Sequence, residues 1–104
     1  MAAAAKTFGS FREFYPFYLG EHADRTCRRL HFAGTSLVLL AAALAVATRH
    51  FAWLWLMPVA GYGLAWVGHF FFEKNRPATF RYPLYSLMGD FVMYKDIWMG
   101  KVPI

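Results

Sequence analysis

The sequence predicts an all-α integral membrane protein, built as a two-span helical hairpin with an amphipathic interfacial helix at each end. Two observations lead to this fold class. Of the 104 residues, 59% are hydrophobic and only 16% are charged, whereas roughly 25% are charged in typical globular proteins. In addition, residues 30–48 and 51–72 contain no Asp, Glu, Lys or Arg. A bilayer can cover this much apolar surface, which a small soluble domain cannot bury.

The two uncharged runs are the predicted membrane spans. They contain 19 and 22 residues, and a helix that crosses a ~30 Å hydrocarbon core needs about 20. Only Arg49 and His50 separate them, so a tight antiparallel hairpin is expected. Small residues provide a seam where the two backbones can approach closely. The seam pairs Ala41 and Ala45 with Gly61 and Ala65.

Apolar and aromatic residues recur at roughly helical spacing on both sides of the hairpin, a pattern typical of amphipathic helices in a membrane interface. Residues 1–29 are the predicted N-terminal interfacial segment. Residues 83–100, starting at Pro83, are predicted to form a helix that lies in the interface or re-enters the bilayer. Together with the spans they make a single membrane domain, residues 1–104.

Basic residues predict the orientation of the hairpin. Five Lys or Arg residues precede His31 and five follow Glu73, whereas the turn between the spans has only Arg49. The positive-inside rule therefore places both termini in the cytoplasm. The net charge of +5 comes mainly from residues that flank the apolar runs. It favours anionic membrane lipid as a partner and argues against nucleic acid.

Histidine positions indicate a site at the cytoplasmic end of the hairpin. His31 precedes His50 by 19 residues and His69 follows it by 19, which places each about 28 Å from the turn along its helix. In an antiparallel hairpin, His31 and His69 therefore return to the same depth. Glu73 follows His69 by one helical turn, and His22 precedes His31 in a polar stretch. Three imidazoles and one carboxylate can thus converge.

These residue types suit iron, zinc, manganese or copper, and two histidines with one carboxylate form a non-haem iron(II) oxygenase arrangement. Each residue also has an ordinary explanation. His22 can simply be solvated in its polar stretch. His31 can bond lipid or backbone at a span end, and His69 can bond the neighbouring helix. Glu73 can pair with Lys74 or Arg76 at a helix end. The equal depth of His31 and His69 is the observation that favours a shared metal site.

Two segments, FYLGEHADRTCRRLHFAGT and AWVGHFFFEKNRPATFRYPLYSLMGDF, resemble the small membrane family of 2-hydroxy fatty acid dioxygenases. They carry the signatures H-x8-H-F-x-G-T and G-H-F-x-x-E-K-x-R-P-A, which are specific when they occur together. The resemblance covers roughly residues 14 to 100. Eukaryotic members of this family act in the breakdown of phytosphingosine to odd-chain fatty acids.

The resemblance implies an iron(II)-dependent dioxygenase that consumes dioxygen and shortens a long-chain 2-hydroxy fatty acid by one carbon, which leaves as carbon dioxide. Glu73 matches the glutamate of the motif, either as a ligand or as a residue that orients a histidine. Arginine suits a carboxylate better than lysine because it binds with two parallel hydrogen bonds. The predicted metal ligands are His22, His31, His69 and Glu73. The residues expected to bind the substrate are Arg76, Lys74 and Arg25.

Other functions fit the same residues. A non-enzymatic membrane module would use the basic, aromatic interface to bind anionic lipid or a partner helix. A haem-binding hairpin would use His31 and His69 as axial ligands, and a zinc hydrolase would use the same ligands as the dioxygenase. Because a hairpin of two spans encloses little volume, a homo-oligomer is a further expectation.

Overall fold

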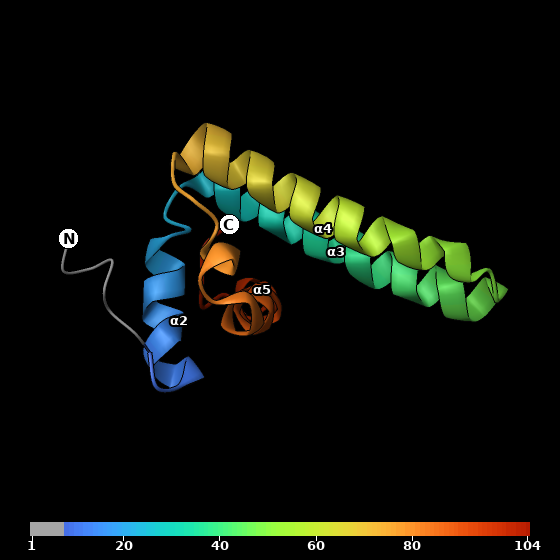
Figure 1. Cartoon of the computed structure of the whole chain (residues 1–104), viewed down its shortest axis with the longest axis horizontal. Coiled ribbons are helices and arrows are strands. Elements are labelled where there is room, and N and C mark those ends of the chain that lie inside the picture. Colours follow the sequence, from blue (N-terminus) through green and yellow to red (C-terminus); the bar gives the residue numbers. More distant parts are fainter. Residues whose placement is uncertain (1–7) are drawn as a thin grey trace.

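The computed structural model describes residues 8–104, and this part of the chain is helical without any β-strand (Figure 1). Residues 1–7 of the predicted interfacial segment lie outside the described residues. Two long helices pack along each other, and two shorter helices lie beside one end of the pair. The elements are α2 (Phe11–Gly20), α3 (Arg25–Thr48), η1 (Phe51–Trp55), α4 (Leu56–Val67), η2 (Gly68–Glu73), η3 (Ala78–Phe80) and α5 (Pro83–Trp98).

The first long helix, α3, begins five residues before the predicted span. Asp24 caps it, because its side-chain oxygen accepts a hydrogen bond from the Cys27 backbone N–H at 2.9 Å. The arginines of the first turn are therefore helical, although hydropathy places them outside the span. At the other end, Arg49 adopts a left-handed conformation with φ of 60°, which ends α3 and turns the chain back.

The second long helix runs without interruption over Phe51–Glu73. It starts with the 3₁₀ turn η1, continues as α4 and ends in the π-helical turn η2. Lys74 then adopts a left-handed conformation with φ of 62°, so the helix stops before the proline that follows. The composition of this helix predicted its length, whereas the change to a π-helical turn left no mark in the hydropathy pattern.

Close backbone contacts join α3 to α4. A Cβ at Gly34 would lie 3.2 Å from the Ala60 carbonyl oxygen, and a Cβ at Gly61 would lie 3.1 Å from a methyl group of Val38. Larger side chains would therefore separate the helices. Gly61 belongs to the seam as predicted, but it faces Val38 rather than Ala41, which is buried one turn further along.

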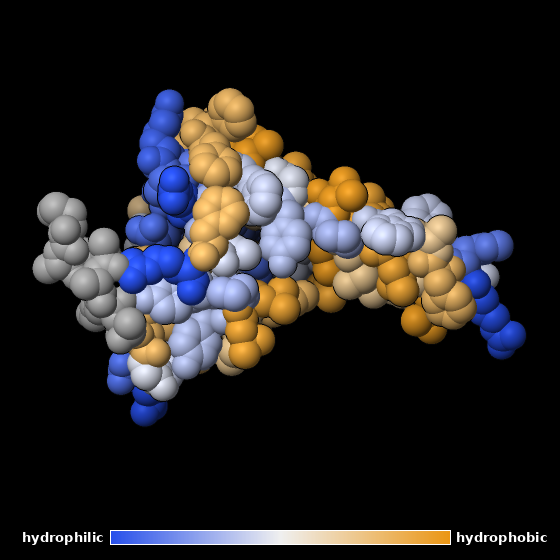
Figure 2. Space-filling model, viewed as in Figure 1, coloured by the Kyte–Doolittle hydropathy of each residue, from blue (hydrophilic) through white to orange (hydrophobic). Residues whose placement is uncertain are grey.

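Both long helices leave most of their apolar residues exposed. By length and composition each could cross a membrane, yet only 28% and 11% of their most apolar windows are buried inside the protein. A core helix of a soluble protein is mostly buried. Figure 2 shows hydrophilic side chains gathered at the two ends of the long axis, with apolar surface over α3 and α4 between them.

Helix α5 exposes most of its large apolar side chains and buries two polar ones, Ser86 and Asp96. Its buried positions are Ser86, Gly89, Met93 and Asp96. Its exposed large side chains are Leu84, Leu87, Met88, Phe91 and Trp98. This arrangement is the reverse of a helix on a water-soluble protein and suits contact with lipid. The structure has a helix over Pro83–Trp98 within the predicted residues 83–100, and its place in the interface or the bilayer stays a prediction.

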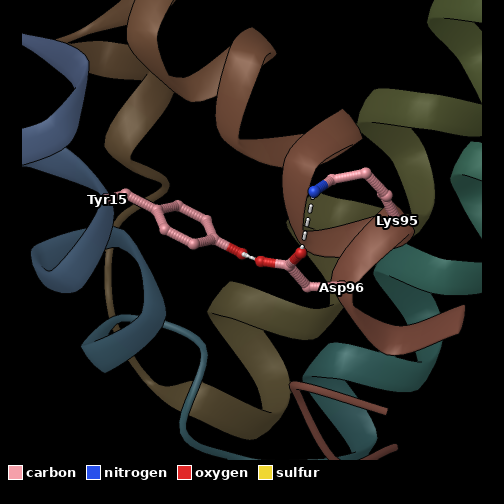
Figure 3. A network of polar contacts seen from close by, with 3 residues as sticks. All are labelled: Tyr15, Lys95 and Asp96. Atoms are coloured by element: carbon pink, nitrogen blue, oxygen red, sulfur yellow. Dashed lines mark hydrogen bonds and ion pairs between the residues drawn. The ribbon is translucent and has the colours of Figure 1, made fainter. Parts of the chain in front are cut away.

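The flanking helices α2 and α5 pack on each other. Phe14 and Tyr18 of α2 are buried in a cluster that includes Met93, so part of the aromatic spacing in α2 serves this contact. The Tyr15 hydroxyl donates a hydrogen bond to Asp96 at 2.8 Å, and the exposed Lys95 lies 3.2 Å from the same carboxylate (Figure 3). Docking of α2 on α5 fixes the helix end from which the loop bearing His22 departs.

Candidate metal centre

Three histidines from separate parts of the sequence meet where the long helices approach α2 and α5. His22 lies in the loop between α2 and α3, His31 lies in α3 and His69 lies in η2. All three are buried, with 1%, 5% and 2% of their surface exposed. The Nε2 atom of His22 lies 3.0 Å from that of His31 and 3.0 Å from that of His69.

The other ring nitrogen of each histidine has its own acceptor. Nδ1 of His22 donates to the Tyr18 carbonyl at 2.6 Å, and Nδ1 of His31 donates to the Cys27 carbonyl at 3.0 Å. Nδ1 of His69 donates to Oδ1 of Asn75 at 2.7 Å. A neutral imidazole has one N–H group, so these bonds leave every Nε2 without a proton. This pattern is the usual support for metal-binding histidines.

Three bare Nε2 lone pairs therefore point into one small space. None can donate to another, so the cluster has no internal hydrogen bond that would explain its geometry. A metal ion explains it, because ligands at ~2.1 Å and near right angles lie about 3 Å apart. Burial, together with the neighbouring rings of His31 and His69, lowers the pKa of His22, which keeps this imidazole in the neutral form that binds metal.

The loop that carries His22 is held by Arg28 in the first turn of α3. Its Nη1 donates to the carbonyl oxygens of His22 and Ala23 at 3.0 and 2.6 Å, and its Nε donates to the Pro103 carbonyl at 2.8 Å. One side chain thus connects the loop with the C-terminal tail. The Tyr18 ring also stacks on His22, with ring centroids 4.0 Å apart.

The π-helical turn and the residues after it position His69. Turns of this kind are rare and occur frequently at functional sites. Gly68 allows the approach, since a Cβ there would lie 3.0 Å from the Cys27 sulfur. The chain then folds back so that Asn75 donates its backbone N–H to the His69 carbonyl at 3.0 Å. Its side-chain NH₂ group donates to the Glu21 carbonyl at 3.1 Å, which turns Oδ1 toward His69.

A family model described as 2-hydroxy-palmitic acid dioxygenase Mpo1-like matches residues 8–102. The chain belongs to this family. The family predicted from the two signatures is thereby confirmed, and the three histidines stand at the signature positions. No curated protein and no solved structure matches the chain.

Among the described residues of this Mpo1-like chain, the ligand atoms grouped within 4.8 Å of one another belong to His22, His31 and His69. The carboxylate of Glu73 lies elsewhere, where it accepts a hydrogen bond from the Asp24 backbone N–H at 2.7 Å. It thereby ties the end of η2 to the start of α3. Neither of the two predicted roles of Glu73, metal ligand or residue that orients a histidine, is tested by this contact, and both stay predictions.

The three basic residues expected at the substrate are not in contact with the histidine cluster. Lys74 and Arg76 are exposed and line an open depression together with Phe70 and Asn75. Arg25 is exposed in the first turn of α3. We call these three exposed basic residues the cationic rim, and their part in substrate binding stays a prediction.

Sequence reasoning missed the residues that support the histidines. Asn75 stands at a position that the second signature leaves unspecified, and its bond to His69 depends on the left-handed turn at Lys74. Arg28 was counted only as a basic residue that sets orientation. Nothing in their spacing gives these roles, because Arg28 acts through carbonyl groups of the folded loop and Asn75 through a side chain that the folded chain turns toward His69.

The geometry argues against the haem alternative. A bis-histidine haem needs two imidazoles on opposite faces of a flat macrocycle. The Nε2 atom of His22 lies 3.0 Å from the Nε2 atoms of both His31 and His69. It therefore leaves no room for a flat macrocycle between His31 and His69. The space among the rings suits a single ion.

Proposed function

We propose that this chain is a membrane-bound, iron(II)-dependent dioxygenase that shortens long-chain 2-hydroxy fatty acids by one carbon. The observation that carries the proposal is the convergence of three neutral imidazoles with unprotonated Nε2 atoms. Membership of the 2-hydroxy-palmitic acid dioxygenase Mpo1-like family supports the reaction class.

The reaction has a simple balance. A 2-hydroxy acid and one dioxygen give the acid shortened by one carbon, carbon dioxide and water. The bond between the carboxyl carbon and the hydroxyl-bearing carbon breaks, and the four electrons that these two carbons lose reduce dioxygen. No additional reductant is required by this balance.

The donor set fits iron(II). Imidazole is a ligand suited to iron, zinc, copper and nickel, and three protein ligands leave coordination positions open. When bound, iron(II) would supply the electron-transfer chemistry that dioxygen activation requires. His22, His31 and His69 would hold the ion, and the carbonyl and amide acceptors at their Nδ1 atoms would keep the rings in the binding tautomer. Glu73 would act as a positioning residue at the start of α3.

The cationic rim of Arg25, Lys74 and Arg76 would bring the substrate carboxylate toward the site. Long-range attraction of this kind raises the rate of encounter without direct contact at the reacting atoms. Arg25 and Arg76 suit a carboxylate better than Lys74, because a guanidinium group can form two parallel hydrogen bonds with it.

The proposal includes insertion in a membrane. Helix α3 and the helix Phe51–Glu73 would span it, with the exposed apolar surfaces in contact with lipid. Both termini would be cytoplasmic, because ten of the eleven basic residues flank the hairpin and only Arg49 lies in its turn. The metal centre would then lie at the cytoplasmic interface, where a carboxylate meets water and an acyl chain meets lipid.

Product analysis tests this function. The full chain, loaded with iron(II) in lipid nanodiscs, is given 2-hydroxypalmitate under oxygen. We expect pentadecanoate, carbon dioxide and consumed dioxygen in equal amounts, and no product from palmitate. Zinc-loaded protein is expected to be inactive. If the wild type releases no shortened acid while anionic lipid binds equally well with and without the three histidines, the chain is a lipid-binding module instead.

A further inference from the structure

A cavity of about 310 Å³ lies between α3, α4 and α5. Its walls are mainly apolar, with Val38 from α3, Met57 and Gly61 from α4, and Phe91 from α5. The polar side chains in its lining are those of His31, Thr35, Tyr62 and Asp90. From His31 to Val38 the α3 wall is about 10 Å long, at 1.5 Å per residue. We call this cavity the apolar groove.

The apolar groove leads to the metal centre. A second, very small cavity of about 10 Å³ is lined by all three histidines. It shares His31, Tyr62, Ala65 and Asp90 with the groove. The small cavity lined by the histidines and the apolar space between the helices are therefore adjacent, with these four residues as their common wall. A molecule with a polar head and an apolar tail fits this order of surfaces.

Ser86 provides an independent observation at the polar end. Its side chain is 2% exposed, it lines the small cavity with the histidines, and its hydroxyl has no hydrogen-bond partner within the described chain. A buried hydroxyl without a partner is unfavourable and uncommon. Beside it, Asp90 accepts a hydrogen bond from the Tyr18 hydroxyl. Ser86 is thus available to a polar group that enters from the groove.

We propose that the apolar groove binds the unbranched acyl chain of the substrate, that the Ser86 hydroxyl hydrogen-bonds its polar head, and that Met57 at the far end limits chain length. This assignment rests on the proposed function and identifies the substrate-binding part of that site. The volume lies at the lower end of the range for ligand pockets, about 300–1,000 Å³. The apolar residues around Val38 and Met57 disfavour a second charged group at that part of the groove.

A photoreactive probe locates the chain directly, independently of turnover. The probe is 2-hydroxypalmitate with a diazirine in the middle of the acyl chain, added to the metal-loaded full chain in nanodiscs. We expect labelled peptides from the groove walls of α4 and α5, and loss of label with excess unlabelled 2-hydroxypalmitate. Label spread over the outer faces of α3 and α4, or competed equally by phospholipid, would overturn the assignment.

Two leucines of α5 give a matched pair of variants. Leu87 lines the apolar groove, whereas Leu84 is outside it and 66% exposed. Both are surface positions, so neither change removes a core side chain. Leu87→Trp should reduce groove labelling about tenfold and shift turnover toward shorter 2-hydroxy acids, and Leu84→Trp should change neither. Met57→Ala should extend the range to longer chains. Equal labelling in both tryptophan variants would contradict the proposal.

Ser86→Ala tests the head contact. Because the hydroxyl has no partner in the protein, its removal should leave the melting temperature unchanged or higher. The KM for 2-hydroxypalmitate should rise about three- to tenfold, the change expected from the loss of one neutral hydrogen bond. A lower melting temperature with unchanged KM would show a structural role and refute the contact. Absence of product from the wild type would refute the proposed reaction, while the probe would still decide whether the groove holds an acyl chain.

Discussion

Replacement of Asn75 by alanine should weaken metal binding although Asn75 does not touch the metal. In the wild type, Oδ1 of Asn75 accepts the Nδ1–H of His69 at 2.7 Å, and the Asn75 NH₂ group donates to Glu21 at 3.1 Å. Without this acceptor, His69 can place its proton on either nitrogen and can rotate. Either change removes the lone pair that Nε2 directs toward His22.

The expected size follows from these contacts. Loss of such a supporting partner typically costs 10- to 100-fold in metal affinity, or about 1.4–2.7 kcal/mol. One neutral hydrogen bond contributes about 1 kcal/mol, and fixing the tautomer accounts for the remainder. The fold should tolerate the change, because the backbone N–H of residue 75 still donates to the His69 carbonyl.

Competition with a chromogenic chelator measures the affinity, with thermal unfolding of the metal-free protein as the check on folding. Asn75→Asp, which keeps an acceptor for His69, should retain more affinity than Asn75→Ala. Arg76→Ala, a change at an exposed residue nearby, is the control and should bind metal like the wild type. An affinity for Asn75→Ala within twofold of the wild type would refute the tautomer argument.

Two further predictions concern α5. Burial raises the pKa of Asp90 to about 6, although the Tyr18 hydroxyl bond acts in the opposite direction. The folded state thus favours the protonated carboxyl, whose stabilising effect is present below about pH 4 and is lost as the pH rises through about 6. Asp90→Asn should therefore stabilise the metal-free protein at neutral pH by up to about 3 kcal/mol, and denaturant unfolding that shows a loss would contradict this. A Cβ at Gly89 would lie 2.8 Å from the Tyr18 ring, so Gly89→Ala should lower the free energy of unfolding by about 1–3 kcal/mol. Because Tyr18 stacks on His22, the same change should also weaken metal binding. Unchanged unfolding and metal affinity would disprove this prediction.

The sequence was sufficient for the elements that hydrophobicity controls. Two uncharged runs predicted the two long helices, and Pro83 predicted the start of α5. Equal spacing of His31 and His69 from His50 predicted that the first two would meet. Composition predicts these helices because a long apolar segment in a membrane has few ways other than a helix to form its backbone hydrogen bonds.

The remaining features depend on contacts that no local pattern contains. Ordinary α-helical spacing predicts Glu73 one turn after His69 on the same face, whereas the structure has the π-helical turn η2 over Gly68–Glu73. In the structure, Glu73 instead binds the Asp24 backbone. Similarly, the buried polar face of α5 could not be read from its sequence, because only the docking of α2 shows which side faces inward.

Metal content measures the central claim most directly. The full chain, isolated under anaerobic conditions with iron(II), should contain close to one metal ion per chain. His22→Ala, His31→Ala and His69→Ala should each lose most of it, whereas His50→Ala, a change in the exposed turn, should retain it. Wild-type protein without stoichiometric metal, or a His69→Ala variant that keeps both its metal and its turnover, would contradict the account.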